Sequence, residues 1–334
     1  MSCSCEAMNI TVILCTYNRC QSLVKALSSV ALSRLPESVA WEVLVVDNNS
    51  RDQTRQVVAD FCSRYPGRFR YLFESQPGKS YALNSGITEA QGDVLAFMDD
   101  DVMVEPMWLQ KLTAALLKGK WAGCGGRILP ERYTSLRWLP QGRYAFAPLA
   151  AFDLGLEAGR LEEAPFGTNM AFQKALFAKY GGFRTDLGPR PGSEIRSEDT
   201  EFGNRLLAAG EQLWYEPSAI VYHTVPQNRL RKQYFLAWWF DRARADIQAF
   251  GRPANTKLVL AGIPLRSFGR LAACTARWVL AVGPSRRFSN KLRVWSVAGQ
   301  ILECYRQAHA ARRQTQRYLG PSPSSFRRSK HAGD

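Results

Sequence analysis

Three consecutive aspartates, Asp99 to Asp101, follow the apolar segment 94–98. Carboxylates at the end of a buried strand repel one another and resist burial unless a cation compensates them. Mg²⁺ and Mn²⁺ prefer oxygen ligands, and proteins commonly hold them with one or two carboxylates plus the phosphates of a substrate. Asp99 and Asp101 point to the same side of an extended segment. The pattern therefore predicts a divalent metal site for a phosphate-bearing ligand, and a solvated acidic loop is the alternative.

The elements around this cluster alternate between strand and helix. Apolar runs at 10–15, 41–47, 68–74 and 92–100 are each followed by a helical pattern. Nearly unbroken apolar strands alternating with helices predict a parallel sheet that is covered on both faces. Ligands of such sheets bind at the carboxyl ends of the strands, so we expect the polar residues that follow the first, second and fourth strands to line one rim.

Shorter strands are expected further along, at 121–129, 164–173 and 213–223, with a helix at 197–210. Ser197 is a suitable cap for this helix, and the acidic residues of its first turn suit the helix dipole. Strands of this second section would extend the sheet.

Charge is divided unevenly along the chain. The net charge is +15, yet residues 226–334 hold 21 of the 44 Lys and Arg residues and only 4 of the 29 Asp and Glu residues. A basic segment on a near-neutral body predicts an anionic surface as partner. We expect reduced cysteines, no signal peptide and no membrane span, because the eight cysteines are scattered and no apolar run is long enough.

Five segments, 11–19, 42–54, 78–102, 167–183 and 197–223, resemble in order and spacing the successive blocks of the family 2 glycosyltransferases with the GT-A fold. The resemblance covers roughly residues 9–225. It implies an α/β GT-A fold, a Rossmann-like and mostly parallel sheet flanked by helices, with a helical basic C-terminal extension.

The resemblance also implies a domain division. The catalytic domain would span 1–225, with a nucleotide-binding half at about 9–105 and an acceptor and base half at about 120–225. A basic amphipathic helical extension would follow at 226–320. The composition of 321–334 predicts a disordered tail.

Site residues follow from the same resemblance. Asp101 and His223 would bind the metal, although a lone histidine at a strand end is often structural. The residues expected to contact the nucleotide are Thr16, Tyr17, Asn18, Arg19, Asp47, Lys79, Asn84, Asp99 and Asp100. Asp100 would be solvent-facing or a supporting group, and it is the aspartate of the three that we least expect to matter. Asp47 has the alternative role of a turn residue, and Lys79 that of a solvated surface lysine.

The segment Gly167, Thr168 and Asn169 would approach the donor sugar or the acceptor, with a plain tight turn as the alternative. An inverting transfer needs a base that takes a proton from the acceptor hydroxyl. The family pattern places this role in the acidic pair, and we favour Asp199 over Glu198. The alternative is that both only complement the helix dipole.

These expectations combine into a metal-assisted, inverting transfer from a nucleotide sugar, with a UDP-sugar favoured, to a glycan or lipid-linked acceptor. Mn²⁺ or Mg²⁺ would be the cofactor. The alternative is a non-catalytic nucleotide-binding or carbohydrate-binding relative of the same fold. A dehydrogenase would need a G-x-G-x-x-G motif after the first strand, and a nucleotidyltransferase a glycine-rich triphosphate loop; "CTYNRC" is neither.

The basic extension carries an aromatic cluster, Trp238, Trp239 and Phe240. Further apolar positions lie beside the cations Arg266, Arg270, Arg277, Arg286, Arg287, Lys291 and Arg293. Aromatic residues beside cations on a helix are typical of an interfacial helix on anionic lipid. The alternative is a set of helices that pack on the catalytic domain. Nucleic acid is not expected, because no recognised nucleic-acid motif accompanies the charge. We therefore expect a cytoplasmic enzyme of cell-envelope polysaccharide synthesis, peripheral at the inner face of the membrane.

Overall fold

The computed structural model describes residues 9–132, 136–139, 145–192, 195–251 and 258–318, with the backbone alone for 313–318. Strands and helices alternate through the first part of the chain, as the apolar runs predict. The elements are β1 (Ile10–Thr16), α1 (Cys20–Ala31), β2 (Trp41–Asp47), α2 (Thr54–Arg64), β3 (Phe69–Phe73), α3 (Lys79–Glu89), β4 (Val94–Asp99) and α4 (Trp108–Leu117).

These four strands lie in the order β3-β2-β1-β4, and every neighbouring pair is parallel. The strand order reverses at β1, so a crevice forms at the carboxyl ends of β1 and β4. Register fixes which residues meet there. Cys15 of β1 lies opposite Asp99 of β4, and Thr16 lies opposite Asp47 of β2. The polar residues that follow these strands therefore lie together at the carboxyl ends of β1, β2 and β4, as predicted.

Beyond β4 the sheet becomes mixed. The order continues β4-β8-β6-β9-β5, with β7 beside β9, which makes a nine-stranded sheet in the described residues. Both neighbours of β8 run antiparallel to it, whereas β6 and β9 are parallel. The remaining elements of this part are β5 (Val102–Val104), β6 (Gly123–Pro130), η1 (Ala147–Leu149), β7 (Gly159–Leu161), β8 (Asn169–Gln173), α5 (Ala175–Tyr180), α6 (Glu198–Ala208) and β9 (Leu213–His223).

A cluster of five phenylalanines lies beneath the crevice and joins β4, β8, α5, α6 and the loop before α6. The Phe177 and Phe202 rings stack with centroids 4.5 Å apart, and Phe172 meets Phe202 edge-on at 5.2 Å. Phe97 of β4 and Phe183 complete the cluster. Buried aromatic pairs of this kind contribute both apolar area and a preferred geometry. The cluster thus fixes the start of α6 against the end of β4.

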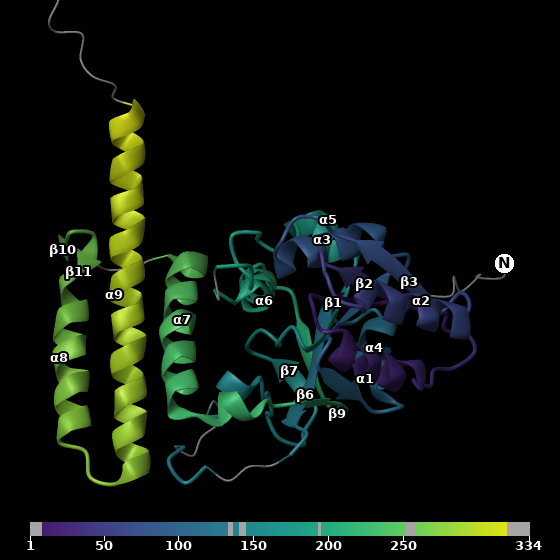
Figure 1. Cartoon of the computed structure of the whole chain (residues 1–334), viewed down its shortest axis with the longest axis horizontal. Coiled ribbons are helices and arrows are strands. Elements are labelled where there is room, and N and C mark those ends of the chain that lie inside the picture. Colours follow the sequence, from purple (N-terminus) through teal and green to yellow (C-terminus); the bar gives the residue numbers. More distant parts are fainter. Residues whose placement is uncertain (1–8, 133–135, 140–144, 193–194, 252–257, 319–334) are drawn as a thin grey trace, which may run out of the picture.

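Three helices follow the sheet and lie side by side (Figure 1). The last elements are η2 (Gln227–Leu230), α7 (Lys232–Phe250), β10 (Val259–Leu260), β11 (Ile263–Pro264), α8 (Leu265–Val279) and α9 (Pro284–Tyr318). Helix α7 lies between the sheet part and α9, and α8 is outermost. The predicted tail at 321–334 lies outside the described residues. Among the described helices, none is both long and apolar enough to cross a membrane.

Helix α7 is a packing helix. Trp238, Trp239 and Phe240 are only partly exposed, and Gly299 of α9 lies so close to the Phe240 backbone that a Cβ there would clash with it. The Trp138 ring meets the Phe235 and Phe288 rings edge-on, which ties the segment before η1 to α7 and α9. The structure therefore shows α7 packed on the catalytic part, which is the alternative that we left open for the basic extension.

Candidate active site

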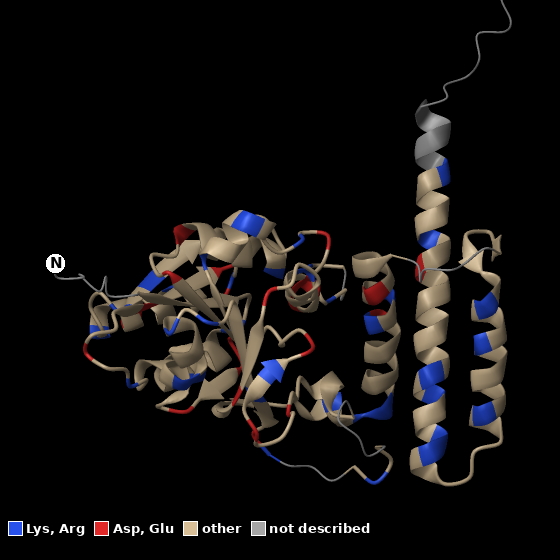
Figure 2. Ribbon diagram, turned by 180° about the vertical axis from the view of Figure 1, so that it is seen from behind, with Lys and Arg blue, Asp and Glu red and all other residues tan. Residues whose placement is uncertain are grey.

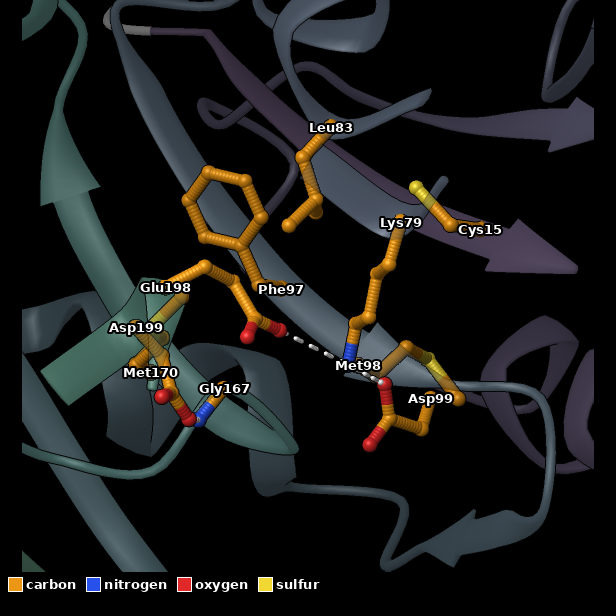
Figure 3. A pocket seen from close by; sticks show the side chains of 10 residues that line it. All are labelled: Cys15, Lys79, Leu83, Phe97, Met98, Asp99, Gly167, Met170, Glu198 and Asp199. Atoms are coloured by element: carbon orange, nitrogen blue, oxygen red, sulfur yellow. Dashed lines mark hydrogen bonds and ion pairs between the residues drawn. The ribbon is translucent and has the colours of Figure 1, made fainter. Parts of the chain in front are cut away.

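A small cavity of about 10 Å³ lies at the carboxyl ends of β1 and β4, where the first residues of α3 and α6 converge (Figure 3). All of the residues that line it belong to blocks singled out in the sequence. The cavity is lined by Cys15, Lys79, Leu83, Phe97, Met98, Asp99, Gly167, Met170, Glu198 and Asp199. Two acidic centres, one on β4 and one on α6, therefore meet at one place.

Lys79 joins these two centres. Its Nζ lies 2.6 Å from Asp99 Oδ1 and 3.8 Å from Glu198 Oε1, and Figure 3 shows the ammonium between the two carboxylates. Burial alone would lower the pKa of Lys79, but Asp99 and Glu198 outweigh it and raise the pKa above its ordinary value. The alternative of a solvated surface lysine is wrong, because the side chain is a fixed cation that is only 25% exposed.

Asp99 is held on both oxygens. Lys79 contacts Oδ1, and the Thr168 hydroxyl donates to Oδ2 at 2.6 Å. Burial would raise the pKa of Asp99, yet the Lys79 charge and these hydrogen bonds bring it below its ordinary value. Asp99 is therefore ionised and oriented by its neighbours.

Asp100 takes the second of its two expected roles, that of a supporting group. It is not solvent-facing but only 5% exposed; the Thr16 hydroxyl donates to it at 2.7 Å and Arg19 Nη1 at 3.0 Å. Burial is the largest influence on it and raises its pKa to about 6, although Arg19 acts in the opposite direction. Because β4 ends at Asp99, the chain turns and carries the Asp100 side chain inward. Asp100 anchors the end of β1 and Arg19.

Asp101 and His223 come together through the pairing of two strands. Val102 of β5 lies opposite His223 of β9, which places His223 Nε2 3.5 Å from Asp101 Oδ1. Arg19 Nη1 also donates to Asp101, at 2.8 Å. Burial would raise the pKa of Asp101, but His223 and Arg19 outweigh it and lower the pKa. His223 is 3% exposed, and its Nδ1 has no hydrogen-bond partner among the described residues.

Asp101 and His223 fit a divalent ion whose remaining ligands come from the substrate and from water. No group of three or more His, Cys, Asp or Glu side chains suited to a metal occurs in the described part of the chain. Mg²⁺ and Mn²⁺ are usually bound by one or two protein carboxylates, with waters and substrate phosphates as the other ligands. Two converging side chains are therefore enough for an ion that arrives with a diphosphate.

Glu198 and Asp199 open α6 in two different environments. Glu198 is 4% exposed, and its Oε2 has no hydrogen-bond partner in the described structure. Burial first, and the neighbouring Asp199 second, raise the pKa of Glu198 to about 7 against the opposing charge of Lys79. Asp199 is half-buried; its Oδ2 accepts from the Gly167 N–H and its Oδ1 from the Thr200 N–H, both at 2.6 Å.

Ser197 does not cap this helix through its side chain, so that prediction is wrong. Its backbone adopts φ 93°, in the left-handed region that is unfavourable for a residue with a Cβ, and its Oγ is buried without a partner among the described residues. The geometry turns the chain so that Glu198 and Asp199 follow it directly into the cavity wall. Strained residues of this kind cluster at functional sites.

Two predicted site residues lie elsewhere. The Asn169 side chain is 1% exposed, donates to the carbonyls of Arg127 and Ala219 and accepts from Trp108 Nε1, so it is a core residue. Asn84 exchanges hydrogen bonds with the Phe183 backbone and faces a second cavity. Asn84 is five residues after Lys79 and therefore lies on a different face of α3, whereas Leu83, four residues after Lys79, lines the first cavity.

The remaining predicted residues lie at the carboxyl ends of β1 and β2. Tyr17 is 47% exposed, and Asn18, at φ 51°, accepts from the Arg51 N–H. Asp47 is 2% exposed and accepts from the Ser50 N–H and the Tyr71 hydroxyl, both at 2.9 Å. Both of its oxygens are engaged within the protein, as in the turn role that we left open.

Sequence reasoning missed two residues. Tyr71 supports Asp47, and Cys15 lines the first cavity. Burial raises the pKa of the Cys15 thiol above its ordinary range. The strand pattern carried a signal for Cys15, because a residue paired in register with the last residue of β4 must lie beside the aspartates.

A family model and two similar relatives agree on one protein family. The family model described as "Glycosyl transferase family 2" matches residues 11–181. Succinoglycan biosynthesis protein ExoM of Rhizobium meliloti is 28% identical over 253 residues, which cover 74% of this chain and 75% of ExoM. Glycosyltransferase AglE of Haloferax volcanii is 27% identical, over 70% of this chain and 75% of AglE.

A solved structure supports the fold. The mannosyltransferase PcManGT from Pyrobaculum calidifontis, in complex with GDP-Man and Mn²⁺, superposes with a TM-score of 0.59 and 18% identity, over 89% of this chain and 87% of that one. The predicted GT-A fold, with its central sheet flanked by helices, is therefore confirmed. The family match spans half of the chain and includes the strand end with the aspartates. The chain belongs to glycosyl transferase family 2 and is a glycosyltransferase.

Proposed function

We propose that this enzyme transfers a sugar from a nucleotide-sugar donor, a UDP-sugar in the first instance, to a hydroxyl group of a glycan or lipid-linked acceptor, with inversion at the anomeric carbon. One observation carries the proposal. Asp99 at the end of β4 and Glu198 and Asp199 at the start of α6 line one cavity, and Lys79 contacts both Asp99 and Glu198. A diphosphate site and a base site side by side are what such a transfer requires.

The diphosphate would lie on the β4 side. Asp101 and His223 are the residues that would hold Mn²⁺ or Mg²⁺, and a bound divalent ion would neutralise the negative charge of the leaving diphosphate. Tyr17 is exposed at the nucleotide side of the rim. Arg19, which contacts Asp100 and Asp101, is a cation close enough to contribute to binding phosphate.

The base would act from α6. Asp199 is half-buried at the cavity wall, and the N–H groups of Gly167 and Thr200 fix its carboxylate while leaving further lone pairs for an acceptor hydroxyl. Asp199 takes the hydroxyl proton as the acceptor oxygen attacks the anomeric carbon from the face opposite the leaving group, which inverts the centre. Glu198 is buried against Lys79 and sets the electrostatic environment of that lysine.

We keep the domain division as part of the proposal: a catalytic domain at 1–225, with nucleotide-binding and acceptor halves, then the helical extension at 226–320 and a tail. Site residues come from both halves. We further propose that the enzyme works at the cytoplasmic face of a membrane on a cell-envelope glycan. The succinoglycan-biosynthesis relative and the basic extension support this proposal.

The test is a panel of UDP-sugars and GDP-sugars with Mn²⁺, Mg²⁺ or a chelator, with nucleotide release and the anomeric configuration of the product as readouts. Asp101→Ala should abolish metal-dependent binding of the nucleoside diphosphate. Asp199→Asn should keep donor binding and lose transfer by a factor on the order of a hundred or more. Normal transfer by Asp199→Asn, together with loss in Glu198→Gln, would move the base role to Glu198.

A retained configuration in the product would refute inversion. Binding of a nucleotide sugar without release under every condition would favour the non-catalytic relative instead. These outcomes separate the chemistry from the choice of donor, because each is read on whichever donor of the panel binds.

A further inference from the structure

Helix α8 exposes a continuous apolar stripe. None of its residues is fully buried, and it packs along one side only, against α9. Leu265, Phe268 and Val279 are 43%, 40% and 62% exposed. Together with the exposed Ala272 and Ala276 they recur every three or four residues, so they lie on one face of the helix.

Apolar exposure continues past both ends of α8. Half of the large apolar side chains that are exposed in the described residues lie between positions 258 and 282. Before the helix, Leu258 and Leu260 at the β10 hairpin are 69% and 62% exposed; after it, Leu280 and Val282 are 79% and 87% exposed. Every protein exposes single apolar side chains, but a group of them on one side of the molecule indicates a contact surface.

A row of arginines lies on the other side of the exposed surface of α8, separated from the stripe by the small exposed residues Gly269 and Ala273. Arg266, Arg270 and Arg277 are four and seven residues apart, which places them on one line along α8, and all three are exposed. Figure 2 shows blue on α8 and on the neighbouring part of α9, with red further along α9. The sequence of α8 contains no acidic residue. Glu303 of α9 is 7% exposed and contacts Arg244 of α7 at 3.3 Å.

The charge decides between the possible occupants of this surface. A second copy of the chain seated on α8 by two-fold symmetry would bring arginine rows together with no acidic residue on α8 to compensate them. An anionic lipid surface accommodates both features, because apolar side chains enter the acyl boundary while arginines contact phosphate head groups.

We infer that α8, with the apolar residues at both of its ends, lies flat on an anionic lipid bilayer and docks the enzyme there. The sequence pointed both to Trp238, Trp239 and Phe240 and to the apolar positions beside the later arginines. The structure places the aromatic cluster on the packing helix α7, so of these two helices only α8 keeps the exposed surface. The inference does not depend on the transfer chemistry, since no residue of α8 lines the first cavity.

The test uses the full chain and sedimentation with vesicles of phosphatidylcholine, alone or mixed with phosphatidylglycerol. The protein should bind the mixed vesicles and release as salt increases. Arg270→Gln/Arg277→Gln should weaken binding roughly 30-fold, because each cation near an anionic membrane contributes a factor of about five. Phe268→Glu/Val279→Glu should weaken it roughly tenfold or more, since both charges enter the apolar stripe.

Matched controls distinguish α8 from general charge or apolar content. Arg64→Gln/Lys118→Gln removes two exposed cations from α2 and the end of α4, and Leu156→Glu places a charge at a side chain that is 78% exposed. Both controls should bind like the parent chain. Release of nucleotide from a sugar nucleotide, measured without vesicles, should be unchanged in every α8 variant, which shows that these variants are folded.

Two results would overturn the inference. One is an absence of binding to the mixed vesicles at low salt while the protein is folded and active. The other is binding of the α8 variants as tight as that of the controls. A concentration-dependent dimer that only the α8 variants lose, without vesicle binding by the parent chain, would assign the surface to a second copy and also refute the lipid assignment.

Discussion

Glu198 should make the stability of the protein fall as pH rises from its unfolded pKa of 4.5 to its folded pKa of about 7. The carboxyl is 4% exposed, and burial with the nearby Asp199 raises its pKa from 4.5 to about 7. A carboxyl whose folded pKa exceeds its unfolded pKa binds its proton more tightly in the folded state. The folded state is therefore favoured by this group below the unfolded pKa, and that contribution is lost as pH rises through the folded pKa.

The magnitude follows from the shift. Ionising the buried group destabilises the folded protein by roughly 1 kcal/mol at pH 5 and roughly 3 kcal/mol at pH 8. Glu198→Gln has no such charge, and Lys79 keeps its 2.6 Å contact with Asp99. We expect the variant to be more stable than the parent chain, with an advantage that grows between these two pH values by about 2 kcal/mol, or roughly 4–8 °C in Tm.

The assay is thermal unfolding of both proteins at pH 5 and pH 8, followed by tryptophan fluorescence. Glu162→Gln, whose side chain is 83% exposed, is the matched control and should differ from the parent equally at both pH values. An equal Tm difference between Glu198→Gln and the parent at the two pH values would show that burial does not raise the pKa of Glu198. A variant that is less stable at pH 8 would refute the sign of the argument.

Three further substitutions test the site. Lys79→Met should destabilise the fold by about 2 kcal/mol in urea unfolding, because Asp99 keeps only Thr168 as a side-chain partner. Adding Asp99→Asn should restore most of this loss. A double variant without recovery would contradict the pairing of Lys79 with Asp99. Asn169→Ala should lower stability by about 3 kcal/mol or more, since three buried hydrogen bonds disappear, and a neutral effect would return Asn169 to the site. Gly167→Ala places a Cβ 3.1 Å from Asp199 Oδ2, so turnover should fall roughly tenfold or more with donor affinity unchanged; a loss of affinity instead would argue against that contact.

The first half of the fold could be predicted because its local and tertiary preferences agree. The runs at 10–15 and 41–47 became β1 and β2 with almost the same bounds, since continuous apolar strands between helices have few arrangements other than a covered parallel sheet. The antiparallel setting of β8 was not predicted. Its direction depends on β4 and β6, which lie far away in sequence, and the alternation of apolar residues is the same in parallel and antiparallel strands.

Side-chain direction was the main source of error in the site. Asn169 is next to Thr168 in the sequence, yet Thr168 contacts Asp99 while Asn169 points into the core, because successive residues at the start of β8 face opposite sides. For Asp100 the sequence left two roles open, solvent-facing or supporting. The strand ends at Asp99, so side-chain alternation along the strand could not decide between them at that position.

The sequence by itself determined the composition of the site: aspartates at the end of one strand, an acidic pair at the start of a helix, and the order of blocks that marks the family. Only the tertiary structure decided which of these groups interact. Lys79 and Glu198 are far apart in the chain, and the phenylalanine cluster and the pairing of β4 with β8 bring them together. Long-range packing sets such distances, and with them burial and charge, whereas the local sequence sets only which chemical groups are present.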